Sequence, residues 1–336
     1  MIEIINQINN INFLNISVII FIFSLILDLV YGEIPSKVHP VVIIGNIISF
    51  LTDHLINLKN RLSGLFLLLL TIIISLSFFI IILLIASKIN YIFLLIVYIF
   101  ILSSTFSFKL LINSAEDIRF NLIHDIDKAR ESVGFLVSRD TEKLDEKLII
   151  SATIETLSEN IVDSYISPVF YFFLGIIIIN FFDFNLTIKL LLLILFPLIY
   201  RIVNTLDAMV GYKNEKYTLI GFIPANFDDI LNFIPARIGG IFVIITSFIL
   251  DYNWKNSYNV LINDSQKCSS PNSGYTMAPT AGALGIQLVK QGVYIIGSKN
   301  KELGLNDIKK SIDLSKTTMF VFTITILILF MVFRWR

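Results

Sequence analysis

Three acidic residues have a spacing that could hold a divalent cation. Glu155, Glu159 and Asp163 follow one another at intervals of four residues, which places their carboxylates on one face of an α-helix. Like charges at this spacing repel, and few Lys or Arg residues lie beside them. We therefore predict that the three carboxylates, with Asn160 beside them, bind Mg²⁺, which proteins hold through one or two carboxylates plus substrate phosphates. A solvated helix face is the alternative.

A second group of polar residues could bind phosphate or carboxylate groups. Arg139 lies in a break of the helical pattern, and its guanidinium offers a bidentate fork. The neighbouring Asp140 is a candidate catalytic residue, and capping of the next helix is its alternative role. Asn204 and Asp207 lie one helical turn apart where an apolar run ends, and we predict that they also act in catalysis.

Candidate substrate-binding residues lie near the ends of the apolar runs. An acid within such a run is expected to be functional, and Asp28 is one. Gly211 permits close backbone approach and the Lys that follows could hold phosphate, although a surface turn is the alternative there. A loop role is the alternative for His39. The predicted substrate-binding residues are Asp28, His39, Tyr212, Lys213, Asn214, Asp228, Asp229, Arg237, Ser270 and Asn272.

Membrane-spanning helices are the elements predicted to position these residues. The chain of 336 residues is 55% hydrophobic and has a mean hydropathy of +0.80, which is typical of a polytopic membrane protein. The run 238–250 has only 13 residues, which favours a re-entrant segment over a full span. We predict an all-α protein with about six full spans and a single membrane-embedded catalytic domain, residues 1–336. The predicted spans are 16–31, 62–86, 91–111, 165–182, 188–203 and 317–333.

The distribution of basic residues predicts the orientation of the chain. If 238–250 does not cross the membrane, most of the 26 Lys and Arg residues fall on one face, which is then cytoplasmic. If it does cross, the lysines of the last loop change sides and the asymmetry weakens. We therefore predict cytoplasmic helical loops, with both termini on the outer face. These loops are 32–61, 113–164, 201–237 and 251–316.

Two features of the last cytoplasmic loop, 251–316, suggest a ligand-binding turn. Residues 270–274 carry a turn signal, and 278–285 are mostly small residues. Glycines in this run permit close approach of the backbone to a ligand.

Several function classes are excluded or unsupported. A net charge of +0 argues against nucleic acid as a partner. A single cysteine, Cys268, excludes an internal disulfide, and the three histidines are too scattered for a zinc motif. The common nucleotide-binding and hydrolase motifs are absent. What remains is a set of acids, amides and bases predicted to lie at one membrane face.

Six stretches of the chain, taken together, resemble the adenosylcobinamide-phosphate synthase family (CbiB/CobD) of cobalamin biosynthesis. They occur in the family's order and cover nearly the whole chain. Cys268-Ser269 stands where many relatives have His-Pro, so a proton-transfer role for that histidine is unavailable here. The stretches are DLVYGEIPSKVHP (28–40), VGFLVSRDTEKLDE (133–146), ETLSENIVDSYISPVFYFFLG (155–175), NTLDAMVGYKNEKY (204–217), DDILNFIPAR (228–237) and SPNSGY with AGALGIQL (270–288).

The resemblance implies a multipass enzyme of the cell membrane that uses ATP and Mg²⁺. Such an enzyme joins the propionate carboxyl of adenosylcobyric acid to an aminoalcohol or its phosphate, such as aminopropanol phosphate. A complex with other membrane-bound enzymes of the cobalamin pathway is a further expectation.

Two other functions fit the residues alone. A membrane transporter would explain acids near apolar runs, although it is expected to place them at the bilayer midplane on broken helices. A metal-dependent membrane alcohol phosphotransferase would also use carboxylates, but its expected D-G-x-x-A-R string is absent.

Overall fold

The computed structural model describes residues 12–32, 34–137, 140–212 and 214–334. It confirms the predicted all-α polytopic class, because seven helical segments of the described chain are long and apolar enough to cross a membrane. The internal contacts divide the chain into two compact units, residues 1–107, 167–231 and 326–336 in the first and residues 108–166 and 232–325 in the second. Whether the chain acts as one catalytic domain stays a prediction.

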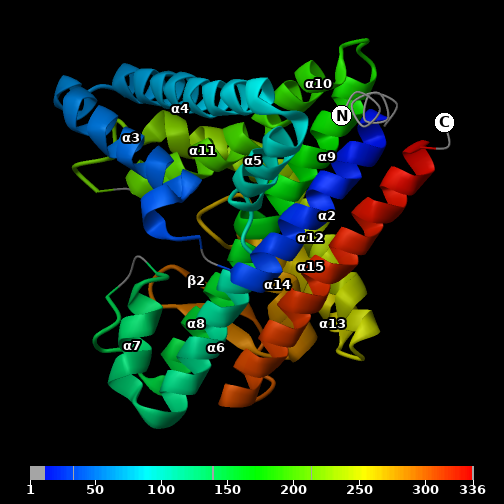
Figure 1. Cartoon of the computed structure of the whole chain (residues 1–336). Coiled ribbons are helices and arrows are strands. Elements are labelled where there is room, and N and C mark those ends of the chain that lie inside the picture. The colour runs from blue at the N-terminus through cyan, green and yellow to red at the C-terminus, as the bar shows by residue number, and fades with distance from the viewer. Residues whose placement is uncertain (1–11, 33, 138–139, 213, 335–336) are drawn as a thin grey trace. The chain divides into compact units, whose positions relative to one another are not determined.

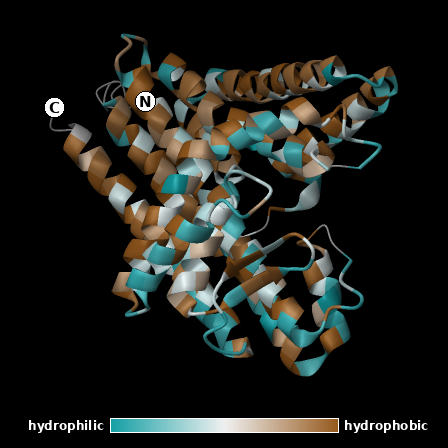
Figure 2. Ribbon diagram, turned by 180° about the vertical axis from the view of Figure 1, so that it is seen from behind, coloured by the Kyte–Doolittle hydropathy of each residue, from teal (hydrophilic) through white to brown (hydrophobic). Residues whose placement is uncertain are grey.

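The first unit consists of long apolar helices (Figure 1). Asparagine side chains accept hydrogen bonds from the first-turn backbone of several of them, as at Asn12, Asn60, Asn90 and Asn185, because an Asn at the N-cap satisfies a backbone N–H that the helix leaves unpaired. Helix α4 is hydrophobic over almost its whole length (Figure 2). The helices are α2 (Phe13–Tyr31), α3 (Pro40–Leu55), α4 (Arg61–Ile89), α5 (Tyr91–Ser103), α9 (Ser167–Asn180), α10 (Leu186–Leu193) and α11 (Leu195–Val210).

The second unit combines amphipathic helices with a small antiparallel hairpin. Its core brings α8 together with α14, the hairpin and α15, through buried residues such as Ile154, Met277, Leu288 and Ile308. Hydrophilic residues are frequent on α6 and α7 (Figure 2). The elements are α6 (Lys109–His124), α7 (Ile126–Gly134), α8 (Glu146–Ile161), a π-helical segment (Val162–Ile166), α13 (Trp254–Asp264), α14 (Gly274–Leu284), β1 (Gln287–Lys290) and β2 (Tyr294–Gly297). Helices α12 (Phe222–Ile249) and α15 (Leu305–Arg334) contribute to both units.

One predicted span and the predicted re-entrant segment have the wrong bounds. The predicted span 91–111 is interrupted, because α5 ends at Ser103 and α6 begins at Lys109. Ser103, Ser104 and Thr105 each donate a side-chain hydrogen bond to a carbonyl three residues back, which competes with continuation of the helix. The segment 238–250 is not an isolated short run, because it is the second half of α12, a helix of 28 residues.

Two predicted loops contain regular structure. Residues 32–61 include α3, and Pro40–Leu58 is one of the segments long enough to span a membrane. Residues 251–316 contain α13, α14, the hairpin and the first turns of α15. The small residues of α14 serve helix packing, since a Cβ on Gly282 would lie 2.6 Å from the Asn256 carbonyl oxygen of α13. The close approach predicted for a ligand is therefore made by a neighbouring helix.

The shared core of the second unit restricts the topology. Residues of α6 and α8 pack against residues of α13, α14 and the hairpin, so we expect 113–164 and 251–316 to lie on the same side of the membrane, and their orientation stays a prediction. Three candidate spans separate these stretches, namely the α9 segment, α10 with α11, and α12. An even number of them must therefore cross, and the excess of basic residues favours α12 as the segment that does not.

We expect Lys143→Cys, Glu215→Cys and Lys255→Cys, each in a Cys268→Ser background, to react with an impermeant thiol reagent from the same side of the membrane. All three residues are exposed. Labelling of Lys255→Cys from the side opposite to Lys143→Cys would contradict the shared core. Labelling of Glu215→Cys alone from the opposite side would show instead that α12 crosses, together with only one of the two candidate spans between residues 143 and 215.

Candidate functional site

The carboxylate of Glu155 is buried at the junction of α8 and the hairpin. Glu155 is only 4% exposed. Ser151 donates a hydrogen bond of 2.7 Å to Oε1, and the Tyr294 hydroxyl donates one of 2.9 Å to Oε2. Burial, followed by the charge of Glu155, raises the pKa of Tyr294 well above its ordinary value. Tyr294 therefore stays protonated and remains a donor.

The other members of the acidic row are more accessible. Glu159 and Asp163 are half-buried, and the Asn160 amide donates to the Thr156 carbonyl at 3.0 Å. The helix changes from α to π geometry at Val162, directly before Asp163. The burial of Glu155 is incompatible with a fully solvated helix face. Among the residues that the structure describes, no three His, Cys, Asp or Glu side chains are grouped as a metal site, so Mg²⁺ binding at this row stays a prediction.

Arg237 makes cation–π contacts with two aromatic rings. Its guanidinium carbon lies 3.4 Å from the ring centroid of Phe233 and 4.1 Å from that of Tyr275. Nη1 donates to the Phe233 carbonyl at 2.6 Å and to Asn272 Oδ1 at 3.2 Å. Two cation–π contacts and two hydrogen bonds restrict the orientation of the guanidinium. The predicted pair Arg237 and Asn272 is therefore brought together, and Ser270 accepts a hydrogen bond from the Asn272 backbone.

A chain of hydrogen bonds connects α11 with α12 in the first unit. Arg201 donates through Nε to the Thr105 carbonyl at 2.7 Å, and through Nη1 to Asn204 Oδ1 at 2.9 Å. The Asn204 amide donates to Asp228, which is only 8% exposed, at 3.4 Å. The predicted residues Asn204 and Asp228 are thus linked. The sequence prediction missed Arg201, although a cation inside an apolar run is a signal of this kind.

The residues that follow Asn204 lie at the end of α11 and in a surface turn. A Cβ on Gly211 would lie 2.0 Å from Asp207 Oδ1, so glycine is required for this carboxylate to lie against the helix end. Asn214 accepts a hydrogen bond of 3.0 Å from the Tyr217 backbone. Tyr212 is exposed. Lys213 lies outside the described residues.

Three further predicted substrate-binding residues are Asp28, His39 and Asp229. Asp28 is 4% exposed near the end of α2. His39 caps α3 by accepting a hydrogen bond of 3.1 Å from the Val41 backbone, which agrees with the loop alternative. Asp229 follows Asp228 on α12.

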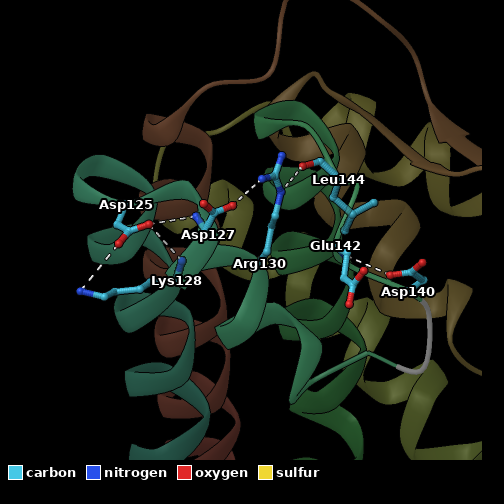
Figure 3. Close-up of polar contacts among 7 residues, drawn as sticks. All are labelled: Asp125, Asp127, Lys128, Arg130, Asp140, Glu142 and Leu144. Carbon is cyan, nitrogen blue, oxygen red and sulfur yellow. Dashed lines mark hydrogen bonds and ion pairs between the residues drawn. The ribbon is translucent and has the colours of Figure 1, made fainter.

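The loop between α7 and α8 is fixed by local contacts (Figure 3). Arg130 donates a hydrogen bond of 2.9 Å to the Leu144 carbonyl and one of 2.6 Å to Asp127. Asp140 accepts a hydrogen bond of 3.0 Å from the Glu142 backbone. The N-cap of α8 is Asp145, so the alternative role of Asp140 as the cap of this helix is wrong. Arg139 lies outside the described residues, so its predicted role stays a prediction.

Together, the apolar helices and these polar groups define a polytopic helical membrane protein with buried, hydrogen-bonded acids. Residues 21–321 match the family described as CobD/Cbib protein, and the chain belongs to this family. It is similar to a probable cobalamin biosynthesis protein CobD of Methanothermobacter thermautotrophicus, at 38% identity over 91% of this chain and 95% of the relative. The cobalamin biosynthesis protein CobD of Listeria monocytogenes serotype 4b is 38% identical over 88% of this chain and 92% of its own length. No solved structure matches the chain.

Glu155→Ala is expected to lower the free energy of unfolding by about 1–3 kcal/mol, because it leaves the buried hydroxyls of Ser151 and Tyr294 without their acceptor. The control Glu159→Ala, at a half-buried position of the same helix, is expected to change it by about 0.5 kcal/mol or less. Thermal unfolding of both purified variants in detergent measures the difference. Equal melting temperatures would contradict a structural role for Glu155.

Proposed function

We propose that the chain is an amide-bond-forming ligase of cobalamin biosynthesis. It attaches an aminoalcohol, aminopropanol or its phosphate, to the propionate carboxyl of adenosylcobyric acid, with consumption of ATP in the presence of Mg²⁺. Membership of the CobD/Cbib family supports the pathway, as do the names of the cobalamin biosynthesis relatives. The observation that supports the chemistry is the oriented guanidinium of Arg237.

The proposed reaction needs an activated carboxyl group, because a carboxylate is a poor electrophile. In the simplest sequence, a carboxylate oxygen attacks the terminal phosphorus of ATP, and ADP leaves. The amine then attacks the acyl phosphate, phosphate leaves, and the amine nitrogen releases a proton. Positive groups that bind the reacting oxygens stabilise the charge that develops during phosphoryl transfer.

Arg237 is suited to bind a planar anion. Nη1 already has two acceptors, and among the described residues no carboxylate forms an ion pair with Arg237. The remaining N–H groups lie in a plane whose orientation the contacts with Phe233 and Tyr275 restrict. A restricted guanidinium plane favours bidentate contact with a carboxylate or phosphate. We assign to Arg237 the binding of such a group, with Asn272 as the residue that orients it.

The acidic row is compatible with bound magnesium. Mg²⁺ needs only one or two protein carboxylates when substrate phosphates complete its coordination. Glu159 and Asp163 are half-buried and so accessible, whereas the Glu155 oxygens already accept two hydrogen bonds. We assign the metal contact to this row, with Glu159 as its central member. When bound, Mg²⁺ would neutralise the charge of the phosphates.

The enzyme is proposed to lie in the cell membrane with its catalytic loops facing the cytoplasm, where ATP is available. The positive-inside rule supports this orientation. Asn204, Asp207, Asp228 and Asp229 are assigned to orientation of substrates in the first unit.

A transporter is the second candidate, because Asp28, Glu155 and Asp228 are almost buried in helices that are long enough to span a membrane. Acids in such positions often mark transport pathways. Amide formation by purified protein in detergent, without a sealed compartment, would distinguish the ligase from a transporter.

Arg237→Lys keeps the charge but loses the planar fork. We expect it to lower kcat/KM for amide formation by about 10- to 100-fold, the loss typical of a charge-assisted hydrogen bond. The control is Arg119→Lys, which replaces an arginine paired with Glu116 on α6 and is expected to retain activity. Mass spectrometry of the corrinoid product measures both. Wild-type protein that forms no amide would contradict the proposed function, and an Arg237→Lys variant with wild-type activity would remove Arg237 from the site.

Glu159→Gln is expected to raise the Mg²⁺ concentration for half-maximal turnover by about tenfold, the equivalent of about 1.4 kcal/mol. The melting temperature should change little, because loss of one charge also relieves repulsion within the row. A magnesium titration of turnover, with thermal unfolding of the same samples, tests this. An unchanged titration curve in a folded, active variant would rule out Glu159 as a metal ligand.

A further inference from the structure

The hairpin places a lysine on its core-facing side. In the antiparallel register, Leu288 pairs with Ile296 and Lys290 pairs with Tyr294. Residues two apart on a strand point to the same face, so both pairs lie on one side of the hairpin. Leu288 and Ile296 are fully buried in the core of the second unit. Lys290 therefore extends the buried row, and it is itself half-buried.

Lys290 has no ion-pair partner among the described residues, where every ion pair involves other cations. Its amino group lies 5.9 Å from the centroid of the Tyr294 ring. A half-buried ammonium group is usually paired with an anion, since burial without a counter-charge is costly. The position is thus suited to an anion that the protein itself does not supply.

Hydrogen bonds to α8 fix the backbone and the partner strand of Lys290. The Val289 N–H donates a hydrogen bond of 2.9 Å to Ser151 Oγ, and the Ser151 hydroxyl in turn donates one to Glu155. On the partner strand, the Tyr294 hydroxyl donates to the other oxygen of the same carboxylate. Glu155 therefore holds both strands at the point where Lys290 leaves the hairpin. Side chains fixed in this way pay little entropy when they bind a ligand.

The acidic row and Lys290 both influence the Cys268 thiol. Burial raises the pKa of the Cys268 thiol, a hydrogen bond with Ser273 lowers it, the charges of Glu159 and Glu155 raise it, and the charge of Lys290 lowers it. Cys268 packs against the core that contains Leu288 and Met277. A ligand beside this thiol would meet carboxylates from α8 and an amino group from β1.

We propose that Lys290 binds a phosphate group of a substrate beside the acidic row, and that Glu155 is the residue that positions it. A compact ammonium with three donors binds phosphate as a point charge, whereas the fork of Arg237 suits bidentate contact with a carboxylate or phosphate. The lysine supplies the positive charge that lets a phosphate lie near Glu159, where a carboxylate alone would repel it. The identification of the phosphate as that of ATP or of an aminoalcohol phosphate rests on the proposed function.

Calorimetric titration of the full chain in detergent with inorganic pyrophosphate tests the binding step without turnover. Lys290→Met is expected to weaken pyrophosphate binding by about tenfold or more, the loss typical of one charge-assisted contact. Lys310→Met is a matched control, because Lys310 is half-buried and lies 5.9 Å from the ring centroid of Tyr252. It is expected to bind as the wild type does. Lys290→Arg should recover most of the affinity.

Tyr294→Phe tests the positioning role, because it retains the ring but removes the hydrogen bond to Glu155. We expect weaker pyrophosphate binding, and a higher KM for one phosphate substrate with a smaller change in kcat. Separate KM values of Lys290→Met for ATP and for the aminoalcohol phosphate identify which phosphate is bound. A purely structural tyrosine would change the melting temperature but neither binding quantity.

Wild-type binding by Lys290→Met, or no pyrophosphate binding by the wild type, would overturn the proposal. The proposed function can fail separately. Pyrophosphate binding that depends on Lys290 in a protein that forms no amide would contradict the ligase and leave the phosphate site intact. Amide formation by Lys290→Met with unchanged KM values would support the ligase and contradict the phosphate site at Lys290.

Discussion

Burial of the Glu155 carboxylate is the constraint on which the second unit depends. An ionised carboxylate out of water is stable only when its oxygens accept hydrogen bonds. Glu155 takes these bonds from Ser151, one turn earlier on α8, and from Tyr294, 139 residues later. The second bond ties β2 to α8, while the Ser151 hydroxyl ties β1 to the same helix. A short two-stranded hairpin is marginally stable by itself, so these bonds and the core contacts of Leu288 and Ile296 hold it in place.

The first unit satisfies a half-buried charge, that of Arg201, in a different way. Arg201 lies inside an apolar helix and donates to the Thr105 carbonyl, in the stretch that follows the end of α5. Its other nitrogen orients Asn204, whose amide reaches Asp228. The same cation therefore contacts the stretch after α5 and begins the chain of polar groups that links α11 to α12. In both units a charge within apolar surroundings is held by groups distant in sequence.

Local signals predicted the helical membrane class and much of the polar inventory. The apolar runs correspond to α2, α4, α9 and the α10–α11 pair. Arg237 and Asn272 are in direct contact. The sequence could not indicate this contact, because the two residues are 35 positions apart. The two aromatic rings that contact Arg237 also come from separate helices. The end of α5 was missed because three consecutive hydroxyl side chains look neutral in hydropathy. Their hydrogen bonds to the preceding turn interrupt the helix all the same.

Other features depended on signals that composition obscures. The chain is rich in asparagine, yet Asn12, Asn60, Asn90 and Asn185 each cap a helix and so mark where it begins. The hairpin was hidden in a long loop because its strands have only four residues each. The partners of Glu155 could not be found from helical spacing, since one of them lies on that hairpin. For the same reason the regular spacing of the acids could not show that the first member of the row, Glu155, is buried.

A double-mutant cycle on pyrophosphate affinity tests most directly whether the Glu155–Tyr294 hydrogen bond positions Lys290. The wild type, Glu155→Gln, Tyr294→Phe and the double variant are compared by calorimetry under one set of conditions. If the hydrogen bond acts through one shared contact, the double variant binds about as weakly as the weaker single variant, with a coupling energy above about 0.5 kcal/mol. Additive losses from the two substitutions would contradict a shared contact, and with it the role of Glu155 in positioning the lysine.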